Sequence, residues 1–246
     1  MKQHRFLFVL LFVMMLGLII PASKSYAGST DTGLRDYVQN KKDAIILVGD
    51  SRVMLPALKS SRISSGKRKN YVFVFSNGGD ISVISEKKSS SQWIGNYFLK
   101  ALKKYPYAPV VFCLGVNKNN AANINRTKWY DYYIKKYPTH SYFIQTVGPT
   151  EPGKLVKGNY KNKYVTAFNK QLKEKYVTGI EKVKKKTGND NIYFIDAYSY
   201  LVKNGYASPG KKLLGTGDGI HYRRRANDAW YAFMRKSVTK TLKSGQ

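Results

Sequence analysis

Five short apolar runs, rich in β-branched and aromatic residues, constrain the fold of this chain more than any other feature. They cover residues 44–48, 71–75, 110–114, 142–147 and 192–195. None shows the alternation of polar and apolar residues that is typical of a sheet with one face in water. The pattern therefore predicts five strands buried on both faces, as in parallel sheets that helices cover on both sides.

Apolar residues also recur at helical spacing between and after these runs. The three stripes are Ile94, Phe98, Ala101 and Tyr105; then Val165, Phe168, Leu172, Tyr176, Ile180 and Val183; then Ala226, Trp230, Phe233 and Met234. Strands that alternate with helices are joined by βαβ crossovers. The sequence thus predicts an α/β fold with a parallel sheet between helical layers.

The chain starts with a segment typical of a secretory signal peptide. Lys2 and Arg5 precede an apolar run over residues 6–20, and small residues lead to Ala27. The run is shorter than the ~20 residues that a membrane-spanning helix needs. We therefore expect residues 1–27 to direct export, to a secreted or cell-surface location, with cleavage or retention as an anchor left open. Residues 28–246 are predicted to form one domain.

Residues able to do chemistry follow the predicted strands directly. Gly49-Asp50-Ser51 follows the first run, Asn77-Gly78-Gly79 the second, Gly115-Val116-Asn117 the third, and Asp196 the fifth. In a parallel sheet the carboxyl ends of the strands share one edge, where ligands bind. We therefore expect these groups around a common site.

A serine hydroxyl becomes a nucleophile when a histidine held by an acid takes its proton. His221 lies in Asp218-Gly219-Ile220-His221, where the glycines predict a tight turn. A carboxylate three residues away in a turn can hold Nδ1–H, so that Nε2 faces the serine. The alternatives are a helix cap for Ser51 and an incidental surface pair for Asp218 and His221. His140 precedes the fourth run, so we expect it at the surface or at a strand entry, away from this edge.

Donors for a developing oxyanion are expected at the same edge: the backbone N–H groups of Ser51 and Gly79 and the side-chain amide of Asn117. A turn glycine and a capping asparagine are the alternative interpretation. Gly78 competes with Gly79 for the role.

Taken together, the segments at residues 49–51, 77–79, 115–117 and 218–221 resemble, in order and spacing, the motifs of the SGNH/GDSL hydrolases. The resemblance extends over about residues 43–235. It implies a flavodoxin-like three-layer α/β/α sandwich with a five-stranded parallel sheet, and hydrolysis of ester bonds without a cofactor.

Carried over by position, the resemblance implies that Ser51 is the nucleophile, that His221 is the general base and that Asp218 orients it. It implies an oxyanion hole made by Ser51, Gly79 and Asn117. The sequence departs from the family at Lys118, where members commonly carry an acid. This departure implies a more positive pocket.

The formal charge of +29 predicts attraction to polyanions. With export, anionic cell-wall polymers are expected partners and nucleic acid is not; a charge that only keeps the protein soluble is the alternative. Cys113, the single cysteine, lies in an apolar run and is expected to pack in the core. Few histidines and no carboxylate cluster argue against a metal site, and no nucleotide-binding motif indicates a cofactor.

An aromatic cluster over residues 129–133 suggests a place where sugar rings stack. It comprises Trp129, Tyr130, Tyr132 and Tyr133; the alternative is that these rings line the inner face of a helix. Two functions are therefore predicted. The first is a secreted serine esterase acting on O-acetyl groups of cell-wall or extracellular carbohydrate, or on another small ester. The second is a non-catalytic protein of the same fold that binds anionic cell-surface polymers.

Overall fold

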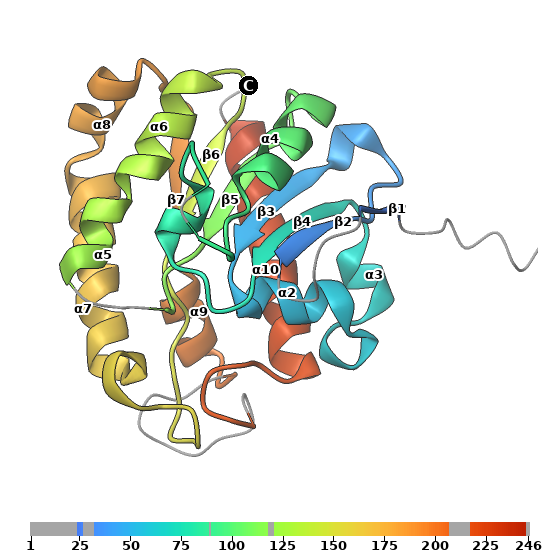
Figure 1. The fold of residues 1–246 in the computed structure, drawn as a ribbon, viewed down its shortest axis with the longest axis vertical. Helices are drawn as coiled ribbons and strands as arrows, with labels where there is room; N and C mark the ends of the chain where they lie inside the picture. The colour runs from blue at the N-terminus through green and yellow to red at the C-terminus, as the bar shows by residue number, and fades with distance from the viewer. Residues whose placement is uncertain (1–23, 27–31, 89, 118–120, 207–216, 245–246) are drawn as a thin grey trace, which may run out of the picture.

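A single mixed sheet forms the centre of the protein (Figure 1). The structure is a computed structural model, and it describes residues 24–26, 32–88, 90–117, 121–206 and 217–244. The sheet has seven strands in the order β1-β2-β4-β3-β5-β6-β7.

The five apolar runs form the five parallel strands that the sequence predicts. They are β3 (Ile45–Gly49), β4 (Tyr71–Ser76), β5 (Val110–Cys113), β6 (Tyr142–Gln145) and β7 (Ile192–Ile195). β3, β4, β5 and β6 are buried throughout, which explains why their sequences are apolar without alternation. Their order is that of the flavodoxin-like sandwich, so the predicted fold class is confirmed.

Two antiparallel strands that the sequence analysis missed extend the sheet beyond β4. β2 (Thr32–Asp36) pairs with β4, and β1 (Lys24–Tyr26) pairs with β2. β2 contains a glycine and two charged residues in five positions, which is typical of strands near a sheet edge but gives no apolar run. β1 lies inside the predicted signal peptide, and cleavage after Ala27 would leave β2 as the edge strand.

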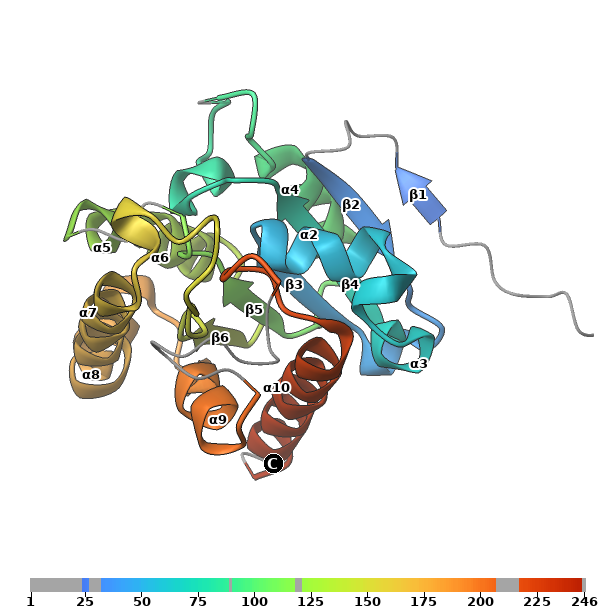
Figure 2. The ribbon, with the colours of Figure 1, turned by 90° about the horizontal axis from the view of Figure 1, so that it is seen from below.

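Helices cover both faces of the sheet, as Figure 2 shows from below. One face packs against α4 (Gly95–Lys104), α6 (Lys128–Lys136), α7 (Asn162–Lys173) and α8 (Ile180–Thr187), and the other against α2 (Ser51–Leu58), α9 (Ala197–Lys203) and α10 (Arg224–Ser244). Ile46 and Val48 point to the first core, and Ile45 and Leu47 to the second. The three predicted stripes lie on α4, on α7 and α8, and on α10.

The remaining helical segments are short. They are α3 (Ser65–Arg68), α5 (Ala121–Arg126), a π-helical turn η5 (Glu174–Thr178) between α7 and α8, and the 3-10 turns η1 (Lys41–Asp43), η2 (Ser60–Arg62), η3 (Ile81–Ile84) and η4 (Gly158–Tyr160). Across the described ranges, none of the helices has both the length and the apolar character required to traverse a bilayer.

The carboxyl end of β3 is the topological switch point of the sheet. β3 lies between β4 and β5, and the helix after β3 packs on one face of the sheet, whereas the helices after β4 and β5 pack on the other. In open α/β sheets, ligands bind at such a point. α10 is anchored nearby, because the buried Trp230 indole donates to Gln145 Oε1 at 3.1 Å. The loop that precedes α10 is thereby brought to the same edge (Figure 1).

Candidate active site

Ser51 is the first residue of α2, directly after β3. Asp50 caps this helix, since its carboxylate accepts a hydrogen bond from the Arg52 N–H at 3.0 Å. Ser51 is therefore not the cap, and its buried side chain faces the turn before α10. Burial raises the pKa of the Asp50 carboxyl, and the hydrogen bonds and the charge of Arg52 oppose this only in part.

A tight turn holds Asp218 and His221. Asp218 Oδ1 accepts hydrogen bonds from the backbone N–H groups of Ile220 at 2.9 Å and His221 at 2.8 Å. Gly219 has a φ of +91°, and a Cβ there would lie 2.4 Å from the carbonyl oxygen of Glu151. The turn therefore requires glycine for both its backbone conformation and its packing.

Hydrogen bonds join Ser51, His221 and Asp218 in one chain. His221 Nδ1 lies 2.7 Å from Asp218 Oδ2, and His221 Nε2 lies 2.8 Å from Ser51 Oγ. With the Nδ1 proton donated to Asp218, Nε2 accepts from the serine hydroxyl. The side chains of His221 and Asp218 are 17% and 18% exposed, so the pair is accessible from solvent but shielded from most of it.

The same contacts set the ionisation of Asp218. Burial raises the pKa of its carboxyl, but the hydrogen bonds from the His221 N–H and imidazole and from the Ile220 N–H outweigh burial and lower it to about 2. Asp218 is therefore ionised at neutral pH.

A pKa lowered in the folded state stabilises the fold at pH values above the unfolded pKa, and this stabilisation is lost as the pH falls through the folded pKa. A fall from 3.8 to about 2 corresponds to roughly 2 kcal/mol. Urea unfolding should show wild type more stable than Asp218→Asn by about this amount at pH 6, with the difference shrinking towards pH 2. The exposed Asp190→Asn is the control, and a difference between wild type and Asp218→Asn that does not vary with pH would contradict the assignment.

Gly79 and Asn117 contact each other after β4 and β5. Asn117 Nδ2 donates to the Gly79 carbonyl at 2.9 Å, and the Tyr160 hydroxyl donates to Asn117 Oδ1 at 2.8 Å, which fixes the orientation of the amide. Gly78 has a φ of +67°, whereas a Cβ on Gly79 would lie 2.6 Å from Ser76 Oγ. Gly78 is thus needed for the turn and Gly79 for close packing, and the Gly79 peptide is the one that Asn117 contacts.

Arg52 connects α2 to two loops of the site. Its buried guanidinium donates to the carbonyls of Ile220 at 2.9 Å, Gly148 at 2.7 Å and Pro149 at 3.1 Å, and it stacks 4.7 Å above the centre of the Tyr222 ring. Arg52 was not predicted from the sequence as a residue of the site. The sequence feature that could have indicated its role is the unusual position of an arginine beside Ser51, in the first turn of a helix with an otherwise apolar sequence.

The loop between β6 and α7 packs against the turn that carries His221. The backbone N–H groups of Glu151 and Leu155 donate to the carbonyls of Gly219 at 2.9 Å and Asp218 at 3.1 Å. Thr150 Oγ1 donates to the Tyr160 carbonyl at 2.8 Å. This loop therefore supports both the His221 turn and the Tyr160 contact to Asn117.

Three other residues considered in the sequence take no part in this hydrogen-bonded chain. His140 is buried before β6, with Nδ1 2.7 Å from the Ala108 carbonyl, so the expected strand entry is right and the expected surface position is wrong. Cys113 is buried in β5, and burial raises the pKa of its thiol. Asp196 caps α9 by accepting from the Ser199 N–H at 3.0 Å.

The aromatic cluster on α6 divides into two halves. Tyr130 and Tyr133 are core residues. The Tyr130 ring stacks on Phe112 with 4.1 Å between ring centres, and the Tyr133 ring is tilted against Phe98 with 4.6 Å between ring centres. These two rings cannot stack on a sugar. For them the alternative interpretation is correct, namely that they line the inner face of the helix. Trp129 and Tyr132 are half-buried. Lys118, the departure from the family pattern, lies outside the described residues.

Comparison with solved structures identifies the fold. The protein has the SGNH/GDSL hydrolase fold. Est24, a carbohydrate acetylesterase from Sinorhizobium meliloti, is 15% identical with a TM-score of 0.52, over 80% of this chain and 99% of that chain. A Bacteroides fragilis protein assigned to the acylhydrolases is 15% identical with a TM-score of 0.57, over 81% of this chain and 88% of that chain.

A GDSL-like lipase from Bacteroides thetaiotaomicron is 14% identical with a TM-score of 0.50, over 84% of this chain and 91% of that chain. No protein-family profile matches the chain, and no curated protein matches it. The relationship is therefore one of three-dimensional structure.

Proposed function

We propose that the protein is a serine ester hydrolase in which Ser51 is the nucleophile, His221 the general base and Asp218 the acid that orients the base. The observation that carries this proposal is the continuous hydrogen-bonded chain from Ser51 Oγ through the His221 ring to the Asp218 carboxylate. Solved structures of the same fold that are named as esterases and lipases support the same reaction class.

In the first half of the proposed reaction, Ser51 Oγ bonds to the carbonyl carbon of the ester while its proton moves to His221 Nε2. The ionised Asp218 stabilises the imidazolium. The bond to the alcohol then breaks, and His221 returns the proton to the departing alkoxide. The products are a free alcohol and an acyl group on Ser51.

In the second half, a water molecule gives a proton to His221 and attacks the acyl carbon. Ser51 leaves and recovers the proton from Nε2, which releases the carboxylic acid. Each half passes through an oxyanion, and we assign its stabilisation to the backbone N–H groups of Ser51 and Gly79 and to Asn117 Nδ2. The Gly79 N–H donates to the Ser76 carbonyl at 3.4 Å, a long contact that a substrate oxyanion can replace.

We propose O-acetyl groups on carbohydrate outside the cell as the substrate class, and export by residues 1–27. Two observations support a carbohydrate substrate. Est24, which has the same fold, is named as a carbohydrate acetylesterase, and Trp129 and Tyr132 on α6 are half-buried rings on which a sugar could stack. The formal charge of +29 supports a negatively charged polymer.

The test offers the full chain p-nitrophenyl acetate, acetylated xylan and a long-chain aryl ester side by side. We expect acetate release from the first two, and a serine-directed phosphonate should label the peptide that contains Ser51. Folded protein that hydrolyses none of the esters and takes up no phosphonate would end the proposal. It would favour the second candidate, a non-catalytic binder of anionic polymers, which the basic hollow described below supports.

A further inference from the structure

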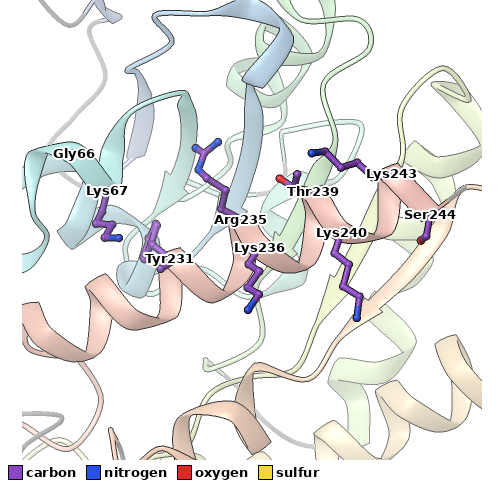
Figure 3. Close-up of a pocket in the computed structure, with 10 residues that line it drawn as sticks. Gly66, Lys67, Tyr231, Arg235, Lys236, Thr239, Lys240, Lys243 and Ser244 are labelled. Carbon is purple, nitrogen blue, oxygen red and sulfur yellow. The ribbon is translucent and has the colours of Figure 1, made fainter. Parts of the chain in front are cut away.

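A hollow of about 820 Å³ lies between the second half of α10 and α3 (Figure 3). Its lining residues are Gly66, Lys67, Tyr231, Ala232, Arg235, Lys236, Thr239, Lys240, Lys243 and Ser244. Half of them are cationic and none is acidic. The hollow is therefore a concentrated positive surface.

The cations of the hollow have no carboxylate partners among the described residues. Within the described residues, no ion pair is formed by Lys67, Arg235, Lys236, Lys240 or Lys243, although other lysines such as Lys104 and Lys175 form ion pairs. Their charges remain available to an anion.

Two of these lysines recur along one side of the helix. Lys236 and Lys240 are four residues apart, a spacing at which like charges destabilise a helix. Figure 3 shows Lys236 and Lys240 projecting from α10 in the same direction, whereas Lys243 projects to the other side of the helix. An anion bound between them would relieve this repulsion.

The hollow is separate from the candidate active site. α10 begins at Arg224, three residues after His221, and rises about 1.5 Å per residue. Lys240 therefore lies roughly 24 Å along the helix from its start. In Figure 1 the C-terminal end of α10 is at the top of the molecule and the loop that carries His221 is at the bottom.

The lining of the hollow favours a polyanion without bases or lipid tails. Tyr231, its single aromatic residue, is 1% exposed, so it offers no ring face on which a nucleobase could stack. The exposed large hydrophobic residues of the described chain are Tyr107, Leu155 and Val177, and none lines the hollow or could anchor it in a membrane.

The arrangement also favours recognition of charge over recognition of shape. The Arg235 guanidinium already donates to the Asp43 carbonyl at 3.3 Å and the Lys69 carbonyl at 2.7 Å. The free cations are thus lysines, which act as mobile point charges rather than as a fixed fork. Anionic groups spaced along a flexible polymer fit such a surface.

We propose that this hollow binds an anionic glycan, whose carboxylate or phosphate groups contact Lys67, Lys236, Lys240 and Lys243. Binding there is independent of ester hydrolysis. For a secreted esterase it would hold the enzyme on the polymer at a point distant from Ser51.

The test compares the triple variant Lys236→Gln, Lys240→Gln and Lys243→Gln with a matched control. The control carries Lys173→Gln, Lys182→Gln and Lys185→Gln, which are exposed lysines of α7 and α8 on the opposite face of the sheet. Within the described part of the chain, none of the three forms an ion pair. Both variants lose the same charge, and glutamine keeps helix propensity close to that of lysine. Fluorescence anisotropy measures binding of labelled polygalacturonate and phosphomannan to the full-length protein, with dextran as the neutral probe.

We expect wild type and the control to bind at least one anionic probe, and the hollow variant to bind it about tenfold or more weakly at 0.15 M salt. Loss of three contacts should lower the slope of log Kd against log salt by about 2. All three proteins should hydrolyse p-nitrophenyl acetate alike, so this readout separates failure of the hollow from failure of the hydrolase. Equal losses in both variants, or no binding of either anionic glycan, would overturn the proposal. Stronger binding of duplex DNA or of phosphatidylglycerol vesicles through the same lysines would do so as well.

Discussion

Alanine in place of Ser51 is expected to lower kcat for p-nitrophenyl acetate by a factor on the order of 10⁴ to 10⁶. The variant retains His221 and Asp218 but has no oxygen that can form the acyl-enzyme. The proposed oxyanion donors remain, so a small residual acceleration should persist. The fold should be unaffected, because the Ser51 hydroxyl contacts His221 and is not the helix cap.

The measurement is initial rates of acetate release at saturating substrate, with the melting temperature of each variant recorded alongside. Ser61→Ala is the matched control, an exposed serine in η2 that should keep full activity. A double variant, Ser51→Ala with His221→Ala, should be hardly slower than Ser51→Ala, because residues that act as a unit have non-additive effects. If Ser51→Ala kept more than a tenth of the wild-type rate, another nucleophile would have to be sought.

The parallel core of the fold could be predicted because its strands are buried on both faces. An unbroken apolar run such as Val110–Cys113 has few other stable environments, so its sequence indicates its place. β2 could not be found in this way, since its pairing with β4 depends on backbone hydrogen bonds that a polar edge sequence also makes. The two extra strands therefore became visible only in three dimensions.

The candidate site was predictable where the chemistry depends on short motifs. Asp218 and His221 are joined by a local turn, and Ser51 follows a strand directly, so spacing along the chain was informative. Tyr160 and Arg52 act through contacts between loops far apart in sequence, and Arg52 to Ile220 spans 168 residues. No local pattern encodes such a contact.

Arg52 is expected to be the most important supporting residue of the site. Replacing it with methionine should destabilise the fold by roughly 3 kcal/mol or more, because three carbonyls lose a charged donor in a buried position. Urea unfolding measures this change. Arg52→Lys should recover only part of it, since an ammonium cannot span the three acceptors as the planar guanidinium does.

Arg52→Met should also lower kcat more than it raises KM. The Ile220 carbonyl held by Arg52 belongs to the residue before His221, so loss of the bond frees the turn that aligns Nε2 with Ser51 Oγ. A displacement of the base of the order of 1 Å is enough to cost about 10²-fold in rate. Rates are compared at 10 °C, under conditions where unfolding curves show each variant to be folded.

Leu102→Ala separates positioning from general destabilisation. Leu102 is fully buried on α4, in the core on the opposite face of the sheet, and its truncation should cost about 2–5 kcal/mol. If Arg52 positions His221, Leu102→Ala keeps nearly the wild-type kcat while Arg52→Met loses it at similar stability. Equal kcat in the two variants would mean that Arg52 serves only the fold. The alignment of His221 would then depend on Asp218 and on the packing of Gly219 against the loop at Glu151.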